Sequence, residues 1–203
     1  MRERPILFNG TMIRALLDGK KTVTRRVVKP QYLDGPWSVK PTESPRHERH
    51  SHDWWLPTGS QPYAALPPCP FGQPGDRLWV RETFAIYGDR KQHVIHYRAN
   101  HPQHVGQKGM GYKPSIHMPR WASRILLEIT DVRVERLQAI TPDQAVAEGI
   151  DGEISRQHLE TSPVRHQCRE AEILGFAGLW NAMGGNWDDN PWVWVVEFRR
   201  VTA

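Results

Sequence analysis

Cysteine is scarce in this chain of 203 residues. The two cysteines, Cys69 and Cys168, lie far apart, and neither belongs to a Cys-x-x-Cys pair. This usage excludes a disulfide framework and a cysteine-rich zinc module, and it is typical of a reducing compartment.

Long apolar runs are also missing. No segment approaches the roughly 20 apolar residues that span a bilayer, and residues 1–5 lead into no apolar signal core. The chain has no Walker or dinucleotide glycine loop, no serine elbow and no internal repeat. We therefore expect a soluble cytoplasmic protein with no membrane partner and no bound cofactor.

What the chain does have is an excess of positive charge. Its 27 lysines and arginines exceed its 22 acidic residues, giving a formal net charge of +5. This balance favours an anionic partner such as RNA or a nucleotide. The length is compatible with one domain and a substantial core.

The most informative segment is a cationic corner at residues 19–26. Apolar spacing predicts a helix over 11–17 with Thr11 as its N-cap, and Gly19 should end it in a left-handed conformation. Alternating β-branched residues then predict a strand over 22–28. Residues that could bind an anion or a carbonyl gather here, although a solvated charged face is the alternative; they are Lys20, Lys21, Thr24, Arg25 and Arg26.

The segment 31–74 has a different composition. It holds nine of the seventeen prolines, and no regular period is visible in it. We therefore predict a long irregular surface insertion without β-ladders, which could serve as a lid or specificity loop over the site. Its His47-x-x-His50-x-His52 cluster lacks a fourth ligand and a rigid frame, so solvated histidines are favoured over a metal site, and no metal is predicted.

Glu82 falls on the apolar face of a strand predicted over 77–87, and further strands are predicted over 93–99 and 124–130. A carboxylate in that position is either paired with an arginine or part of a site, and both remain open. We expect a loop over 100–119 and a turn starting at Asp131. A cluster precedes the third strand and comprises Arg120, Trp121, Ser123 and Arg124. It can stack on a base and hold a phosphate. The alternative is a core tryptophan beside arginines that are exposed or ion-paired.

Thr141-Pro142-Asp143-Gln144 predicts a helix start with Thr as N-cap, Pro at N1 and Gln at N3. This helix should end at Gly149, with Glu148 in its last turn, where a carboxylate opposes the helix dipole. A second helix is predicted over 168–182 and a closing strand over 192–201.

These segments occur in the order typical of the ASCH family, which is similar to the RNA-binding PUA domains. The resemblance rests on short motifs spread from residue 5 to about 200, namely 5–8, 19–25, 74–80, 125–129, 141–149 and 192–198. In particular the chain resembles the longer, phage- and prophage-associated branch of the family. The resemblance implies an α+β fold, a mixed PUA-like β-barrel with flanking helices and long irregular insertions.

Compact members of that family are similar to amidohydrolases that deacylate N4-acetylcytidine with a Lys, a Thr and a Glu. Lys21, Thr24 and Glu148 match those positions. Other members resemble RNA-binding modules or nucleases, so a non-catalytic or nucleolytic RNA-binding module is the alternative. The insertions at 31–74 and 100–119 depart from the compact pattern and could reshape the pocket.

Overall fold

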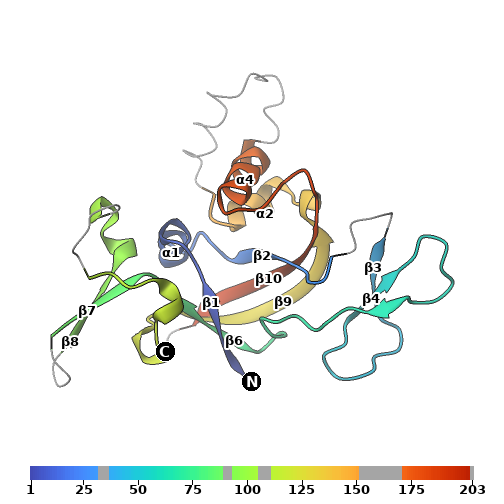
Figure 1. Cartoon of the computed structure of the whole chain (residues 1–203), viewed down its shortest axis with the longest axis horizontal. Helices are drawn as coiled ribbons and strands as arrows, with labels where there is room; N and C mark the ends of the chain where they lie inside the picture. The colour runs from blue at the N-terminus through green and yellow to red at the C-terminus, as the bar shows by residue number, and fades with distance from the viewer. Residues whose placement is uncertain (32–36, 89–92, 105–110, 151–170, 202–203) are drawn as a thin grey trace.

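The structure is a computed structural model that describes residues 1–31, 37–88, 93–104, 111–150 and 171–201. These residues form an α+β fold with three separate sheets (Figure 1). The central sheet has the strand order β1-β6-β9-β10-β2, in which only β1 and β6 are parallel. Its strands are β1 (Glu3–Leu7), β2 (Val23–Val27), β6 (Arg77–Arg81), β9 (Leu126–Arg136) and β10 (Trp192–Val201).

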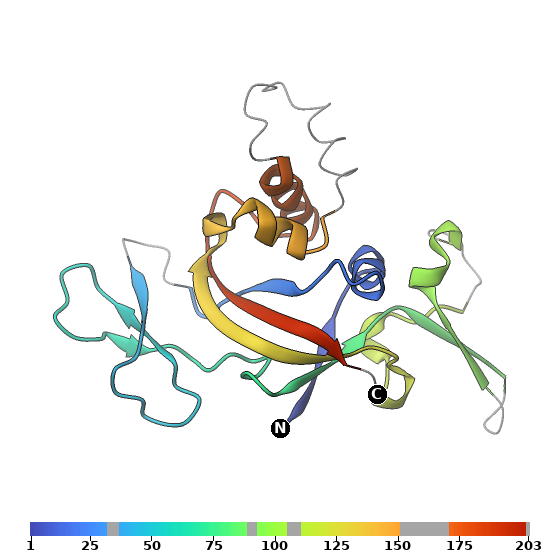
Figure 2. The same ribbon diagram turned by 180° about the vertical axis from the view of Figure 1, so that it is seen from behind.

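The predicted closed barrel is not formed by the described strands. The central sheet is strongly curved, but β1 and β2 remain its two edges (Figures 1 and 2). Where barrel closure would need a backbone ladder between them, a side chain makes the link: Arg26 Nη2 on β2 donates to the carbonyl oxygen of Leu7 on β1 at 2.7 Å.

The first helix, α1 (Gly10–Leu17), is capped two residues earlier than predicted. The Asn9 side chain, not that of Thr11, accepts from the Met12 backbone N–H at 2.9 Å. The helix ends as expected, because Gly19 has φ +71°, a conformation that costs glycine little. This early stop places the next residues in a corner before β2 begins.

Two apolar clusters cover the two faces of the central sheet. Strand alternation divides β10 between them: Trp194 and Val196 pack with Ile13 of α1, whereas Val193 and Val195 face the helices α2 (Pro142–Ala147) and α4 (Ala171–Ala182). Figure 1 shows α2 and α4 together on one side of the sheet. The strand β2 is therefore buried on both faces, between α1 on one side and the α2–α4 pair on the other.

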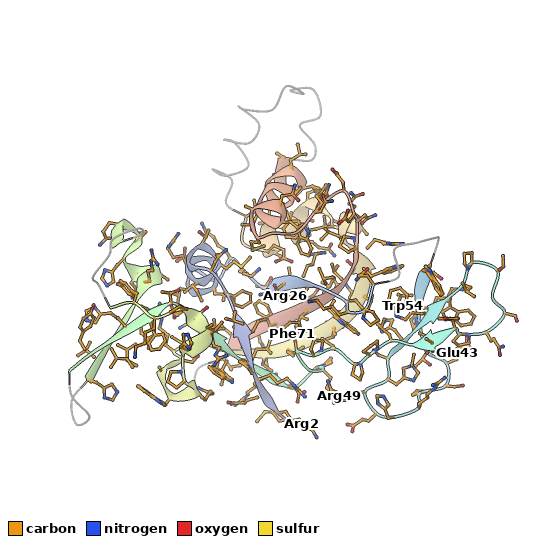
Figure 3. All side chains as sticks on the ribbon, in the orientation of Figure 1. Arg2, Arg26, Glu43, Arg49, Trp54 and Phe71 are labelled. Atoms are coloured by element: carbon orange, nitrogen blue, oxygen red, sulfur yellow. The ribbon has the colours of Figure 1, made fainter. Side chains whose placement is uncertain are left out.

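The 31–74 insertion contains more regular structure than predicted. A small antiparallel sheet is formed by β3 (Ser38–Pro41), β4 (His52–Trp55) and β5 (Ala64–Ala65). Proline did not prevent it, because the prolines fall between these short strands or at the end of β3. Trp54, labelled in Figure 3, is buried in the main core and meets Trp192 edge-on, so the insertion is anchored to the central sheet.

Two further predictions about the path of the chain are wrong. The strand expected over 77–87 breaks after β6, and β7 (Phe84–Gly88) instead pairs with β8 (His93–Tyr97) in a separate hairpin. Asp131 does not start a turn, since β9 continues to Arg136 and absorbs an irregularity opposite Glu197 and Phe198. Short 3-10 turns also occur. Before β9 they are η1 (Arg98–Asn100), η2 (Pro102–His104), η3 (Ser115–His117) and η4 (Arg120–Ala122), and after it η5 (Leu137–Ala139).

The predicted capping box of α2 is confirmed. Thr141 Oγ1 accepts from the Gln144 backbone N–H, and the Gln144 side chain accepts from the Thr141 backbone N–H. Glu148 caps the C-terminus and Gly149 follows with φ +89°. Of the second predicted helix, α4 confirms residues 171–182, while 168–170 lie outside the described residues, as does the loop predicted at 151–166.

Gly149 is expected to be the least replaceable glycine of this region. A Cβ there would lie 2.8 Å from Ala15 Cβ and 3.3 Å from Lys21 Cβ, on a backbone with positive φ. Gly75→Ala is the matched control, because its φ is +86° but nothing lies within 4 Å. Both variants pay the left-handed strain of about 1–3 kcal/mol. Gly149→Ala should lose additional unfolding free energy in urea titrations; equal midpoints for the two variants would contradict the close approach.

Candidate functional site

The ammonium group of Lys21 lies buried in the corner between α1 and β2. Its Nζ donates to the backbone oxygens of Val23 and Glu148, each at 2.8 Å, and to Glu148 Oε2 at 2.7 Å. An ammonium group has three donors, so these contacts use all of them. The side chain is fully shielded from solvent, and that of Glu148 is 2% exposed.

Backbone contacts bring Glu148 to this corner from the far end of α2. The Thr22 N–H donates to the Ala147 carbonyl oxygen at 2.9 Å, which joins the start of β2 to the last turn of α2. Gly149 then lets the chain pass close to Lys21, since no side chain intervenes. The predicted partners Lys21 and Glu148 therefore form a direct ion pair.

Arg25 extends the network on the α2 side. Its Nη1 lies 3.3 Å from Glu148 Oε1, and its Nη2 donates to Gln144 Oε1 at 2.7 Å and lies 3.5 Å from Glu135 Oε2. The Gln144 oxygen is the same atom that completes the α2 capping box. The start of α2 is thus coupled to the buried charges at its end.

Burial makes this cluster electrostatically demanding. Desolvation lowers the pKa of Lys21, and the nearby Glu148 carboxylate opposes that shift, while Arg26 and Arg25 add to it. The pKa of Arg26 is lowered as well, chiefly because its guanidinium is desolvated. The Lys21 ammonium is consequently a stronger acid than a lysine in water.

Thr24 lies on β2 opposite Val196 and is 2% exposed. Alternation along β2 directs Val23 and Arg25 toward the α2–α4 face and Thr24 toward the opposite one. Lys21 Nζ also lies on that opposite side, 5.4 Å from the Phe8 ring centroid. The Thr24 hydroxyl has no hydrogen-bond partner among the described residues. The corner thus puts Lys21 on the Thr24 side of the strand, although the two are three residues apart.

A pocket of about 280 Å³ opens beside this cluster. Its lining comes from β2 and the C-terminal end of α4, and consists of Arg25, Arg26, Val27, Trp180, Met183, Gly184 and Gly185. Three side-chain nitrogens of these residues are shielded from solvent and lack a partner among the described residues: Arg25 Nε, Arg26 Nε and Trp180 Nε1. Trp180 was not among the predicted site residues, because in sequence it reads as an apolar position of a helix.

The second predicted group is separate and mostly engaged internally. Arg124 holds Glu82 by two hydrogen bonds, Nε to Oε1 at 2.8 Å and Nη2 to Oε2 at 2.9 Å, so the arginine-pairing alternative for Glu82 is the one observed. Ser123 donates to the Val80 oxygen, and Arg120 pairs with Glu3 at 2.8 Å. Trp121 remains 59% exposed beside the His93 ring.

Another pocket, of about 460 Å³, adjoins this second group. Its two arginines, Arg14 and Arg98, come from α1 and η1. Neither guanidinium pairs with a carboxylate among the described residues: Arg14 binds the Ala99 oxygen and Thr11 Oγ1, and Arg98 lies over the Tyr112 ring. Glu82 also lines the pocket, but Arg124 neutralises it. Sequence analysis missed both arginines because no local motif joins them.

The histidine cluster is not arranged as a metal site. His50 Nε2 lies 2.8 Å from Asp53 Oδ1, and its Nδ1 accepts from the Arg46 backbone N–H at 3.0 Å, so both ring nitrogens are occupied. Within the described part of the chain, no group of three or more histidine, cysteine or acidic residues could hold a metal ion. The same residues include no helix that is both long and apolar enough to cross a membrane.

Comparisons with known proteins add no assignment: no family model, no curated protein and no solved structure matches the chain significantly.

Removing Glu148 should destabilise the fold more than removing Lys21. Glu148→Gln leaves two buried cations facing each other and is expected to cost about 3–5 kcal/mol in unfolding free energy. Lys21→Met should cost less, because Arg25 still pairs with Glu148. As a control, Glu128→Gln breaks an exposed pair with Arg199 and should cost within about 1 kcal/mol. Urea denaturation would test this order. A larger loss of unfolding free energy in Lys21→Met than in Glu148→Gln would contradict the argument from unpaired buried cations.

Proposed function

We propose that the chain is an ASCH-like amidohydrolase that deacylates an N4-acylated cytidine or a related nucleoside. The observation that carries the proposal is the buried Lys21–Glu148 ion pair, on the same side of β2 as an unpartnered Thr24 hydroxyl. The three residues match the catalytic positions implied by the family resemblance. A fully buried ion pair is a costly way to stabilise a fold, which favours a chemical use for it.

The proposed reaction proceeds through an acyl-enzyme. Thr24 Oγ attacks the amide carbonyl carbon while its proton passes to Glu148. As Glu148 takes up this proton, its hydrogen bond with Lys21 weakens, and the released donor of the Lys21 ammonium, made more acidic by burial, stabilises the oxyanion that forms. Collapse of this intermediate breaks the C–N bond, and Glu148 returns the proton to the departing N4 amine. A water molecule then attacks the Thr24 ester by the same proton route and releases the carboxylic acid.

Turnover of N4-acetylcytidine tests this proposal directly. Thr24→Val removes the nucleophile while nearly keeping its volume, and it should lower cytidine release at least about 100-fold. Thr24→Ser should retain much of the activity because it keeps a hydroxyl. Lys21→Ala and Glu148→Ala should also lose activity, provided that circular dichroism shows them folded. Chromatographic detection of cytidine is the measurement.

Arg199→Ala is the matched control, since this exposed residue of β10 pairs only with Glu128 among the described residues and should leave turnover unchanged. Wild-type protein that is folded but releases no cytidine would overturn the hydrolase proposal.

A second candidate function, an RNA-binding module, is favoured by the pocket that holds Arg14 and Arg98. Two half-buried guanidinium groups without a carboxylate partner among the described residues suit phosphate oxygens. The originally predicted binding residues support it less, because Arg25, Arg120 and Arg124 are each ion-paired.

If this module binds RNA, affinity for a single-stranded oligonucleotide should fall steeply with salt. Each phosphate contact contributes roughly −0.7 to the slope of log K against log salt. The double variant Arg14→Gln/Arg98→Gln should therefore make the slope shallower by about 1.4. Fluorescence anisotropy at several salt concentrations is the measurement, with Arg199→Gln as the surface-charge control. A slope that is unchanged in the double variant would contradict phosphate binding in this pocket.

A further inference from the structure

We infer that Gln144 and Arg25 are positioning residues for the proposed reaction: Gln144 holds Arg25, and Arg25 holds one oxygen of the Glu148 carboxylate while the other oxygen handles the proton. The inference rests on the proposed function and deepens it, because neither residue belongs to the three catalytic positions that the family resemblance supplies.

The two oxygens of the Glu148 carboxylate have different partners. Oε2 accepts from Lys21 Nζ at 2.7 Å, and Lys21 is the group that lies on the Thr24 side of β2. Oε1 lies 3.3 Å from Arg25 Nη1 instead. The side chains of Arg25 and Glu148 are both shielded from solvent, so water does not compete for this contact. One oxygen is thus anchored by Arg25, and the other is left to the lysine.

The proposed proton transfer makes the second contact necessary. When Glu148 takes up the Thr24 proton, its bond with Lys21 weakens, while the backbone oxygens of Val23 and Glu148 still hold the ammonium. The protonated carboxyl group would then be free to turn, unless its other oxygen has a partner. Arg25 Nη1 is that partner. Its charge also favours the ionised carboxylate, which assists return of the proton to the departing amine.

Arg25 is itself held from three other elements. Its Nη2 donates to Gln144 Oε1 of α2 at 2.7 Å and lies 3.5 Å from Glu135 Oε2 of β9. Its guanidinium carbon lies 5.9 Å from the centroid of the Phe176 ring of α4. The Gln144 oxygen also accepts from the Thr141 N–H at 3.1 Å, which fixes its direction. The contacts therefore run from the start of α2 through Arg25 to the carboxylate at the end of the same helix.

Replacing Arg25 leaves Glu148 with a cation, so the role of Arg25 can be tested in a folded protein. In Arg25→Met, Glu148 keeps its ion pair with Lys21 and still interacts with the charge of Arg26. Because loss of an opposite charge favours the protonated carboxyl group, the acidic limb of kcat/KM for N4-acetylcytidine should move up by about 1 pH unit. Arg25→Lys keeps the charge and should move this limb less, although kcat falls because the planar guanidinium is lost.

Gln144→Ala tests the positioning role, and Thr141→Ala is its matched control. Each variant removes one of the two hydrogen bonds of the α2 capping box, but only Gln144→Ala also removes the 2.7 Å acceptor of Arg25. Gln144→Ala should lower kcat roughly tenfold with little change in KM, and it should move the acidic limb to higher pH. Thr141→Ala should lower the unfolding midpoint but keep the kcat and the pH profile of the wild type.

A carboxyl titration followed by carbon NMR measures the same coupling without turnover. The assigned Glu148 carboxyl signal should titrate at higher pH in Gln144→Ala and Arg25→Met than in the wild type or Thr141→Ala. This shift in a protein that does not turn over N4-acetylcytidine would support the positioning of Glu148 and overturn only the hydrolase proposal. Turnover with kcat, pH profile and NMR midpoint equal in Gln144→Ala and Thr141→Ala would overturn the inference alone. Absence of both the turnover and the shift would overturn both.

Discussion

The ion pair between Lys21 and Glu148 joins residues that are 127 positions apart, and much of the surrounding structure is arranged to allow it. The helix α1 has to stop at Gly19 so that Lys21 can lie in a corner, and α2 has to stop at Gly149 so that the chain can pass beside it. Both charges are shielded from water, so Lys21 depends on Glu148 for compensation, and Glu148 depends on Lys21 and Arg25. An error in either helix end would leave a buried charge unpaired.

The pair is also the meeting point of two packing layers. Strand β2 is sandwiched between α1 and the α2–α4 pair, and its alternation sends Thr24 to one layer and Arg25 to the other. Arg25 then reaches Glu148, Gln144 and the pocket under Trp180. A single edge strand in this way carries a hydroxyl, two guanidinium groups and the wall of a pocket. The proposed chemistry follows from that concentration of polar groups on one strand.

Glu82 and Arg124 illustrate why a buried charge alone does not identify a catalytic residue. In the sequence both residues are site candidates, Glu82 because it falls on the apolar face of a strand and Glu148 because it opposes a helix dipole. In the structure Arg124 forms two hydrogen bonds with the Glu82 carboxylate. The Ser123 hydroxyl donates to the backbone oxygen of Val80. Glu148 differs because its partners include a lysine with a lowered pKa, and because a free hydroxyl lies on the same side of the strand.

Local interactions made several features predictable from sequence. The stop of α1 at Gly19, the Thr141 cap of α2 and the closing strand over 192–201 depend on residues close together in the sequence, and all three are present. The same reasoning failed where the structure depends on contacts between segments that are distant in the sequence. The open sheet, the short ladders within the 31–74 insertion and the continuation of β9 past Asp131 depend on which strands meet.

The sequence by itself therefore determined the elements and the residue types available for chemistry. Only the tertiary structure decided which charges neutralise each other and which buried donors remain unpaired. The physical reason is that electrostatic and hydrogen-bond energies depend on distance in space, and the chain path that sets those distances is a property of the whole fold.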